Sequence, residues 1–173
     1  LKSRFITAIL ALPVVLLILW QGGLPFSAFI AIVCVIMGIE WINILSKGDK
    51  FPKILLSGLL VLTALASHDG FGSGLGFYIF GILFSIGMSL LLGVKLSLLS
   101  GGFAYIGAAT LSIILLRSID NGLWLVFFVF WVVWATDVMA YVFGKTIGGP
   151  KLAPVISPNK TWAGLLGGVI GAA

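Results

Sequence analysis

Charged side chains are scarce in this chain. Lys, Arg, Asp and Glu make up 9% of the 173 residues and 61% are hydrophobic, whereas soluble domains carry about 25% charged and roughly 45–50% apolar residues. At a mean hydropathy of +1.25, too few polar side chains are present to cover a surface that faces water on all sides. The composition excludes a soluble globular domain, a disordered chain and a nucleic-acid-binding module, and it indicates an integral membrane protein.

Cysteine and histidine are nearly absent. The single cysteine, Cys34, lies in an apolar run and cannot form an internal disulfide. The single histidine, His68, gives no support for a histidine metal cluster or a His-based catalytic triad. Glycine is common, and the run Gly70–Gly76 is similar to a phosphate-binding loop. It lacks the strand–helix context of such loops, so we predict a flexible turn there.

Long apolar runs predict an all-α, polytopic membrane protein with six spans and the start of a seventh, which begins near Ala163. The connections are short, so successive helices are expected to pack as antiparallel neighbours. The predicted spans are Phe5–Trp20, Leu24–Leu45, Phe51–Ser67, Gly74–Gly93, Leu96–Leu116 and Asn121–Phe143.

The basic residues predict the orientation of these spans. If the N-terminus lies in the cytoplasm, the outer connections hold only Arg117 of the ten basic residues. Cytoplasmic segments of membrane proteins collect Lys and Arg, so this asymmetry favours a cytoplasmic N-terminus. The other nine basic residues then lie in inner segments: Lys2, Arg4, Lys47, Lys50, Lys53, Lys95, Lys145, Lys151 and Lys160.

Two carboxylates fall within predicted spans. Glu40 lies five residues before the inner end of its span and Asp137 six before the end of its own, which places both about 7–9 Å below the cytoplasmic boundary. An ionisable residue inside a membrane is costly and suggests function, here a polar cavity that opens inward; the alternative is a structural ion pair or an interfacial position. Tyr141 and then Lys145 follow Asp137 along the same helix face.

The connection Lys145–Thr161 has three Lys, three Pro and no acidic residue. Ser157 followed by Pro158 predicts a helix start, with Ser157 as N-cap. Asn159, Lys160 and Thr161 would then occupy the first turn, where free N–H groups attract anions such as phosphate. The alternative is a basic loop that contacts anionic lipid headgroups. Beyond it, the small-residue pairs formed by Gly164, Gly167, Gly168 and Gly171 predict close helix packing.

The segments Trp134–Asp137, Ala140–Lys145, Lys151–Pro154 and Ile156–Gly164 resemble the bacterial phosphatidate cytidylyltransferase (CDP-diglyceride synthase) family. The resemblance implies an all-helical enzyme of the bacterial inner membrane whose active site faces the cytoplasm. It implies the substrates CTP and phosphatidic acid, the products CDP-diacylglycerol and pyrophosphate, Mg²⁺ as cofactor, and a homodimer. One departure is Ala163, where members of this family often carry Glu.

The resemblance and the residue chemistry together assign the site. Asp137 and Lys160 are the expected catalytic residues, and Asp137 is also an expected metal ligand. The expected substrate-binding residues are Lys145, Lys151, Ser157, Asn159, Lys160 and Thr161.

The family's strongest motif, with a Pro-Gly-His-Gly-Gly run and an Asp-Arg-x-Asp ending, does not occur in these residues. We therefore expect the main metal ligands beyond Ala173, and an N-terminal two-thirds piece that is inactive by itself. In this interpretation residues 1–120 form N-terminal transmembrane helices, and residues 121–173 begin the catalytic transmembrane region.

Two other classes of protein remain possible at this stage. A piece of a membrane transporter predicts inverted repeats and broken helices near mid-bilayer, and the sequence has no matching pair of halves. A structural membrane subunit would leave the acid-free connection Lys145–Thr161 without a role.

Overall fold

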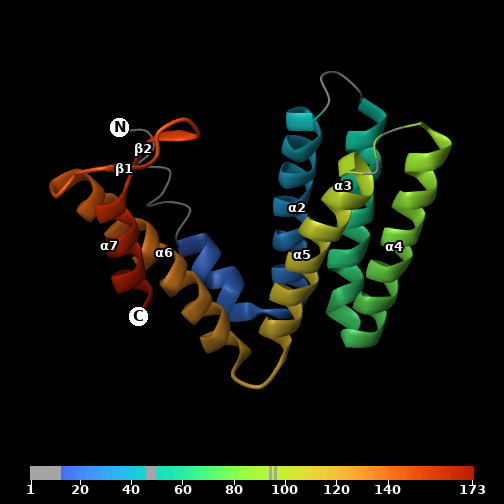
Figure 1. The fold of residues 1–173 in the computed structure, drawn as a ribbon. Coiled ribbons are helices and arrows are strands. Elements are labelled where there is room, and N and C mark those ends of the chain that lie inside the picture. Colours follow the sequence, from blue (N-terminus) through green and yellow to red (C-terminus); the bar gives the residue numbers. More distant parts are fainter. Residues whose placement is uncertain (1–12, 46–49, 94, 96) are drawn as a thin grey trace. The chain divides into compact units, whose positions relative to one another are not determined.

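The computed structural model describes residues 13–45, 50–93, 95 and 97–173. Most of the first predicted span lies outside them, as do Lys2, Arg4 and Lys47; residues 13–21 are helical. The remaining helices are α2 (Gly23–Leu45), α3 (Lys50–Ala66), α4 (Phe71–Leu91), α5 (Gly102–Ser118), α6 (Gly122–Thr146) and α7 (Trp162–Ala172) (Figure 1). A 3-10 turn η1 (Ser67–Asp69), a π-helical turn η2 (Ser97–Gly101) and strands β1 (Lys151–Ala153) and β2 (Ser157–Thr161) complete the elements.

Within the described residues, five helical segments are long and apolar enough to cross a membrane. They match five of the predicted spans, because a segment in lipid must satisfy its backbone groups internally and long apolar runs therefore form helices. The all-α membrane architecture is confirmed; the total number of spans stays a prediction. The segments are Gly23–Ile44, Phe51–Asp69, Phe71–Leu91, Leu98–Ser118 and Gly122–Thr146.

The glycine run Gly70–Gly76 is not a flexible turn, so that prediction is wrong. Helix α4 begins at Phe71, and only Gly70 in this run has a positive φ, of 122°. The hydroxyl of Ser73 donates to the carbonyl of Ala66 at 2.8 Å, which ties the first turn of α4 to the end of α3. A Cβ atom at Gly74 would lie 2.7 Å from Ser67 Oγ, so this glycine permits close packing against η1.

The chain divides into two compact units, Leu1–Leu123 and Trp124–Ala173. In the first unit α3 packs against α2, α4 and α5, and its Leu56 and Leu60 are fully buried together with Phe103 of α5. Polar side chains bind backbone carbonyls between these helices. Trp41 Nε1 donates to the carbonyl of Leu98 in η2 at 3.0 Å.

Arg117 has a structural role in the same unit. Its Nε donates to the carbonyl of Leu19 and its Nη2 to that of Trp20, both at 2.8 Å. Gly22 follows with φ +64°, and a Cβ atom at Gly22 would lie 2.7 Å from Arg117 Nη2. The guanidinium therefore satisfies the last carbonyls of the helical residues 13–21.

In the second unit α7 packs closely on α6 through its glycines. A Cβ atom at Gly164 would lie 3.0 Å from the carbonyl oxygen of Ala140, and one at Gly171 would lie 2.6 Å from that of Ala135. The contacts step in opposite directions along the two helices, so the helices are antiparallel. This confirms that the small residues permit close helix packing.

Between α6 and α7 the chain forms an antiparallel hairpin of β1 and β2, with Lys151 opposite Thr161 and Ala153 opposite Ser157. The all-α prediction did not include this hairpin.

Candidate functional site

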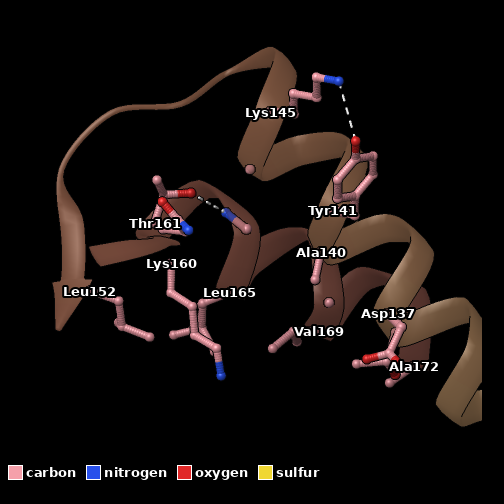
Figure 2. Close-up of a pocket in the computed structure, with 15 residues that line it drawn as sticks. Asp137, Ala140, Tyr141, Lys145, Leu152, Lys160, Thr161, Leu165, Val169 and Ala172 are labelled. Atoms are coloured by element: carbon pink, nitrogen blue, oxygen red, sulfur yellow. Dashed lines mark hydrogen bonds between the residues drawn. The ribbon is translucent and has the colours of Figure 1, made fainter. Parts of the chain in front are cut away.

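A cavity of about 820 Å³ lies in the second unit between α6, the hairpin and α7 (Figure 2). This volume is within the range of about 300–1,000 Å³ that is typical of small-molecule sites. Its lining residues are Thr136, Asp137, Ala140, Tyr141, Gly144, Lys145, Leu152, Asn159, Lys160, Thr161, Gly164, Leu165, Gly168, Val169 and Ala172.

Helical spacing explains how α6 and α7 build this cavity. The α6 residues that line it recur at intervals of four along one face, in the series Asp137, Tyr141, Lys145. The α7 residues do the same in the series Leu165, Val169. Apolar side chains of α7 therefore face polar side chains of α6 across the cavity.

Asp137 and Lys145 lie two helical turns apart along the cavity. Figure 2 shows Asp137 and Lys145 toward opposite ends of the cavity. The hydroxyl of Tyr141 accepts a hydrogen bond from Lys145 Nζ at 3.2 Å, and the same nitrogen lies 5.4 Å from the centre of the Tyr141 ring. Tyr141 thus holds the ammonium group at the cavity rim by a hydrogen bond and a cation–π contact.

The charged groups of the cavity are available to a ligand. Asp137, Lys145 and Lys160 are all exposed, and within the described part of the chain no ion pair occupies any of them. The two ammonium groups give this site a net positive charge that suits phosphate oxygens.

The predicted helix start at Ser157 is wrong. Ser157–Thr161 is strand β2, and α7 begins at Trp162 with Thr161 as its N-cap at φ −121° and ψ 158°. The hydroxyl of Thr161 accepts a hydrogen bond from the Gly164 N–H at 3.1 Å. Pairing with β1 keeps the backbone extended up to this residue, and Pro158 is tolerated because a two-stranded hairpin leaves N–H groups unpaired. Lys160 therefore lies on a strand and not in a first helical turn.

Five of the predicted site residues line this one cavity: Asp137, Lys145, Asn159, Lys160 and Thr161. Lys151 and Ser157 do not line it. Glu40 is an exposed residue of the first unit and is not among the lining residues. Sequence reasoning missed Thr136, whose spacing from Ala140 and Gly144 was the available signal, and the apolar Leu152, Leu165 and Val169, which carry no signal in a chain this rich in apolar residues.

The metal-binding capacity of the described residues is small. None of them form a group of three or more His, Cys, Asp or Glu side chains, and Asp137 is the one carboxylate that lines the cavity. Mg²⁺ commonly binds through one or two carboxylates, several waters and substrate phosphates. Asp137 fits one such ligand position.

Comparison with known proteins identifies the family. The model of the cytidylyltransferase family matches residues 2–173. A phosphatidate cytidylyltransferase of Brucella abortus is 34% identical over 99% of this chain and 64% of its own length. One of Staphylococcus aureus is 34% identical over 97% of this chain and 67% of its own length.

The chain thus spans 64% of the length of the Brucella relative. No solved structure matches it significantly. The resemblance found in the residues of α6, the hairpin and α7 is confirmed, and it extends over nearly the whole sequence. The chain belongs to the cytidylyltransferase family.

Proposed function

We propose that this protein joins CTP and phosphatidic acid to give CDP-diacylglycerol and pyrophosphate. The observation that carries the proposal is the two-sided cavity, in which Lys145 and Lys160 meet the apolar side chains of Leu165 and Val169. Such a lining suits a ligand that is both phosphorylated and lipidic. The names of the relatives from Brucella and Staphylococcus support the same activity.

The reaction needs no nucleophile from the protein. An oxygen of the phosphatidate phosphate attacks the α-phosphorus of CTP, the bond from that phosphorus to the bridging oxygen breaks, and pyrophosphate leaves. The protein contributes chiefly position and charge. Lys145 and Lys160 hold phosphate oxygens, and Asn159, an exposed residue of the cavity lining, supplies an uncharged donor.

Mg²⁺, when bound, neutralises the charge of the triphosphate. Asp137 would hold it, together with substrate oxygens and water. The position of Asp137 in the same cavity as Lys160 supports this role.

Location and assembly are part of the same proposal. The protein lies in the bacterial inner membrane with its N-terminus and the hairpin on the cytoplasmic side, where CTP is found. The charge asymmetry of the connections supports this orientation. A homodimer is proposed from the family resemblance alone.

The direct test is product formation by the complete protein that the gene encodes. Membranes that contain it are given radiolabelled CTP with and without phosphatidic acid, and the lipid fraction is separated by chromatography. We expect label in a lipid that migrates with CDP-diacylglycerol, only when phosphatidic acid is present, and one pyrophosphate released per labelled lipid. CTP that crosses the membrane without labelling any lipid would refute the proposal and favour a transporter.

A further inference from the structure

The tip of the β1–β2 hairpin carries two apolar side chains that nothing in the described structure covers. Val155 is 97% exposed and Ile156 is 88% exposed, the highest values for large hydrophobic side chains among the described residues. Most other exposed apolar side chains belong to membrane-spanning helices, whose lipid contacts explain them. The hairpin is not a span, so its tip needs a separate explanation.

The base of the hairpin lies close in sequence to the end of the apolar helix α6. The span α6 ends at Thr146, β1 begins five residues later at Lys151, and α7 starts at Trp162 directly after β2. Trp162 is 52% exposed, and exposed Trp side chains concentrate at the membrane–water interface. The strands therefore leave from the level of the headgroups.

The hairpin also stays close to the helices. Leu152 of β1 lines the same cavity as Leu165 and Val169, which lie in the first and second turns of α7. The N–H of Ile156 donates to the carbonyl of Ala153 at 3.2 Å, so a tight turn closes the hairpin directly after β1.

The positive charge of the hairpin indicates which kind of surface its tip would contact. Residues 145–161 contain three Lys and no acidic residue. Lys145 and Lys160 line the cavity, whereas Lys151 is exposed and lies outside it. Lys151 is thus a cation at the base of the hairpin without a place in the substrate site, and cations near a membrane are attracted to anionic headgroups.

We propose that the hairpin is an interfacial anchor for anionic lipid. Val155 and Ile156 insert at the boundary between headgroups and acyl chains of the leaflet where α6 ends, and Lys151 contacts headgroup phosphates. The connection between α6 and α7 then has two separate functions. Lys145 and Lys160 bind the ligand of the cavity, while Lys151 and the tip hold the hairpin on the bilayer. The anchor does not depend on the proposed enzymatic activity.

The position of the tip can be measured with a fluorescent probe. The complete protein, in a background without other cysteines, carries Cys34→Ala and Ile156→Cys. It is labelled with an environment-sensitive dye and placed in nanodiscs of phosphatidylcholine with or without phosphatidylglycerol. Asp120→Cys, at an exposed connection, is the water control, and Leu90→Cys, at an exposed site of α4, is the lipid control. Quenching is compared between acrylamide in water and lipids that are spin-labelled near the headgroup.

We expect the probe at position 156 to resemble the lipid control. The shallow spin-labelled lipids should quench it severalfold more than the probe at position 120, and acrylamide severalfold less. Phosphatidylglycerol should shift its emission further to the blue, and Lys151→Gln should abolish that shift while the matched Lys95→Gln retains it. Val155→Cys is a second probe site in case one label disturbs the turn.

Three outcomes would overturn the proposal. Free access of acrylamide to the tip would show that it faces water. Protection from both quenchers would show that protein covers it, either a second copy or another segment. A blue shift that does not depend on phosphatidylglycerol or on Lys151 would show that anionic lipid is not the partner.

Discussion

The hydroxyl of Thr161 accepts a hydrogen bond from the backbone N–H of Gly164 at 3.1 Å, at the point where β2 ends and α7 begins. A Cβ atom on Gly144 of α6 would lie 3.3 Å from the same hydroxyl. One buried oxygen thus joins the helix cap to the contact between α6 and α7. Because Lys160 directly precedes Thr161, this cap also fixes where the Lys160 side chain enters the cavity.

Thr161→Ala should lower the free energy of unfolding by about 1 kcal/mol, since the Gly164 N–H loses its acceptor inside the protein. Thr161→Ser keeps the oxygen and should recover most of the loss. Both are compared with the parent by reversible unfolding in mixed detergent micelles. Equal stability of the Ala variant and the parent would contradict the capping role of Thr161.

Gly167→Ala should separate α6 from α7. Its Cβ atom would lie 2.6 Å from Phe143 Cβ and 2.7 Å from the carbonyl oxygen of Met139, and relief of such overpacking typically costs about 1–3 kcal/mol. Gly87→Ala in α4 is the matched control, because a Cβ atom there meets nothing within 4 Å. The same unfolding assay should show a loss for the first variant only, and equal losses would mean that the glycines serve backbone flexibility and not packing.

Arg117→Ala should destabilise the end of the helical residues 13–21. It removes the donors of two hydrogen bonds, to Leu19 and Trp20, at a cost of about 1–3 kcal/mol. Lys95→Ala, an exposed cation in another connection, should leave the free energy of unfolding unchanged. In a background whose other five Trp residues are replaced by Phe, the emission of Trp20 gives a local readout, and an unchanged emission in Arg117→Ala would refute the cap.

The same contacts explain why one basic residue departs from the orientation pattern. Arg117 is the one cation predicted outside, and its guanidinium binds backbone carbonyls. In a Cys34→Ala background, Lys95→Cys should react with a membrane-impermeant thiol reagent only from the cytoplasmic side, and Asp69→Cys only from the outside. The reverse pattern in intact cells and inverted vesicles would overturn the predicted topology.

The spans were predictable because a backbone in lipid must satisfy its N–H and C=O groups internally, which a long apolar segment does by forming a helix. The predicted span Leu24–Leu45 differs by one residue from α2, Gly23–Leu45. The start of α7 was not predictable from local sequence, because Ser157 and Thr161 are both good N-caps within five residues. What decides between them is the pairing of Thr161 with Lys151 in β1, a contact that local propensity does not encode.

The polar half of the cavity was predictable for a similar reason. Asp137, Lys145 and Lys160 are charged residues in an apolar chain, and charged residues in such a chain suggest a functional site. The apolar half of the cavity was not predictable. In the sequence, Leu152 and Leu165 differ in no way from dozens of other aliphatic residues, and only the fold brings them together. Lys151 was assigned to the same site by proximity in sequence, but it is not among the residues that line the cavity.

Lys160→Ala in the complete protein should weaken the use of CTP or phosphatidic acid. Loss of one charge-assisted phosphate contact costs about 1.5–3 kcal/mol, or roughly ten- to a hundredfold in kcat/KM. Asp137→Asn should lower kcat more severely, because Asp137 is the one carboxylate that lines the cavity and a metal ion or a lysine there would lose its counter-charge. Initial rates at varied CTP and phosphatidic acid separate the two effects.

Matched controls make the kinetic comparison decisive. Lys95→Ala and Asp120→Asn remove the same charges from exposed connections, and they should retain parental kinetics. Unchanged thermal stability in detergent shows that Lys160→Ala and Asp137→Asn still fold. If both of these variants keep near-parental kcat and KM, the cavity between α6, the hairpin and α7 is not the site of the reaction, and the basic hairpin serves the membrane surface alone.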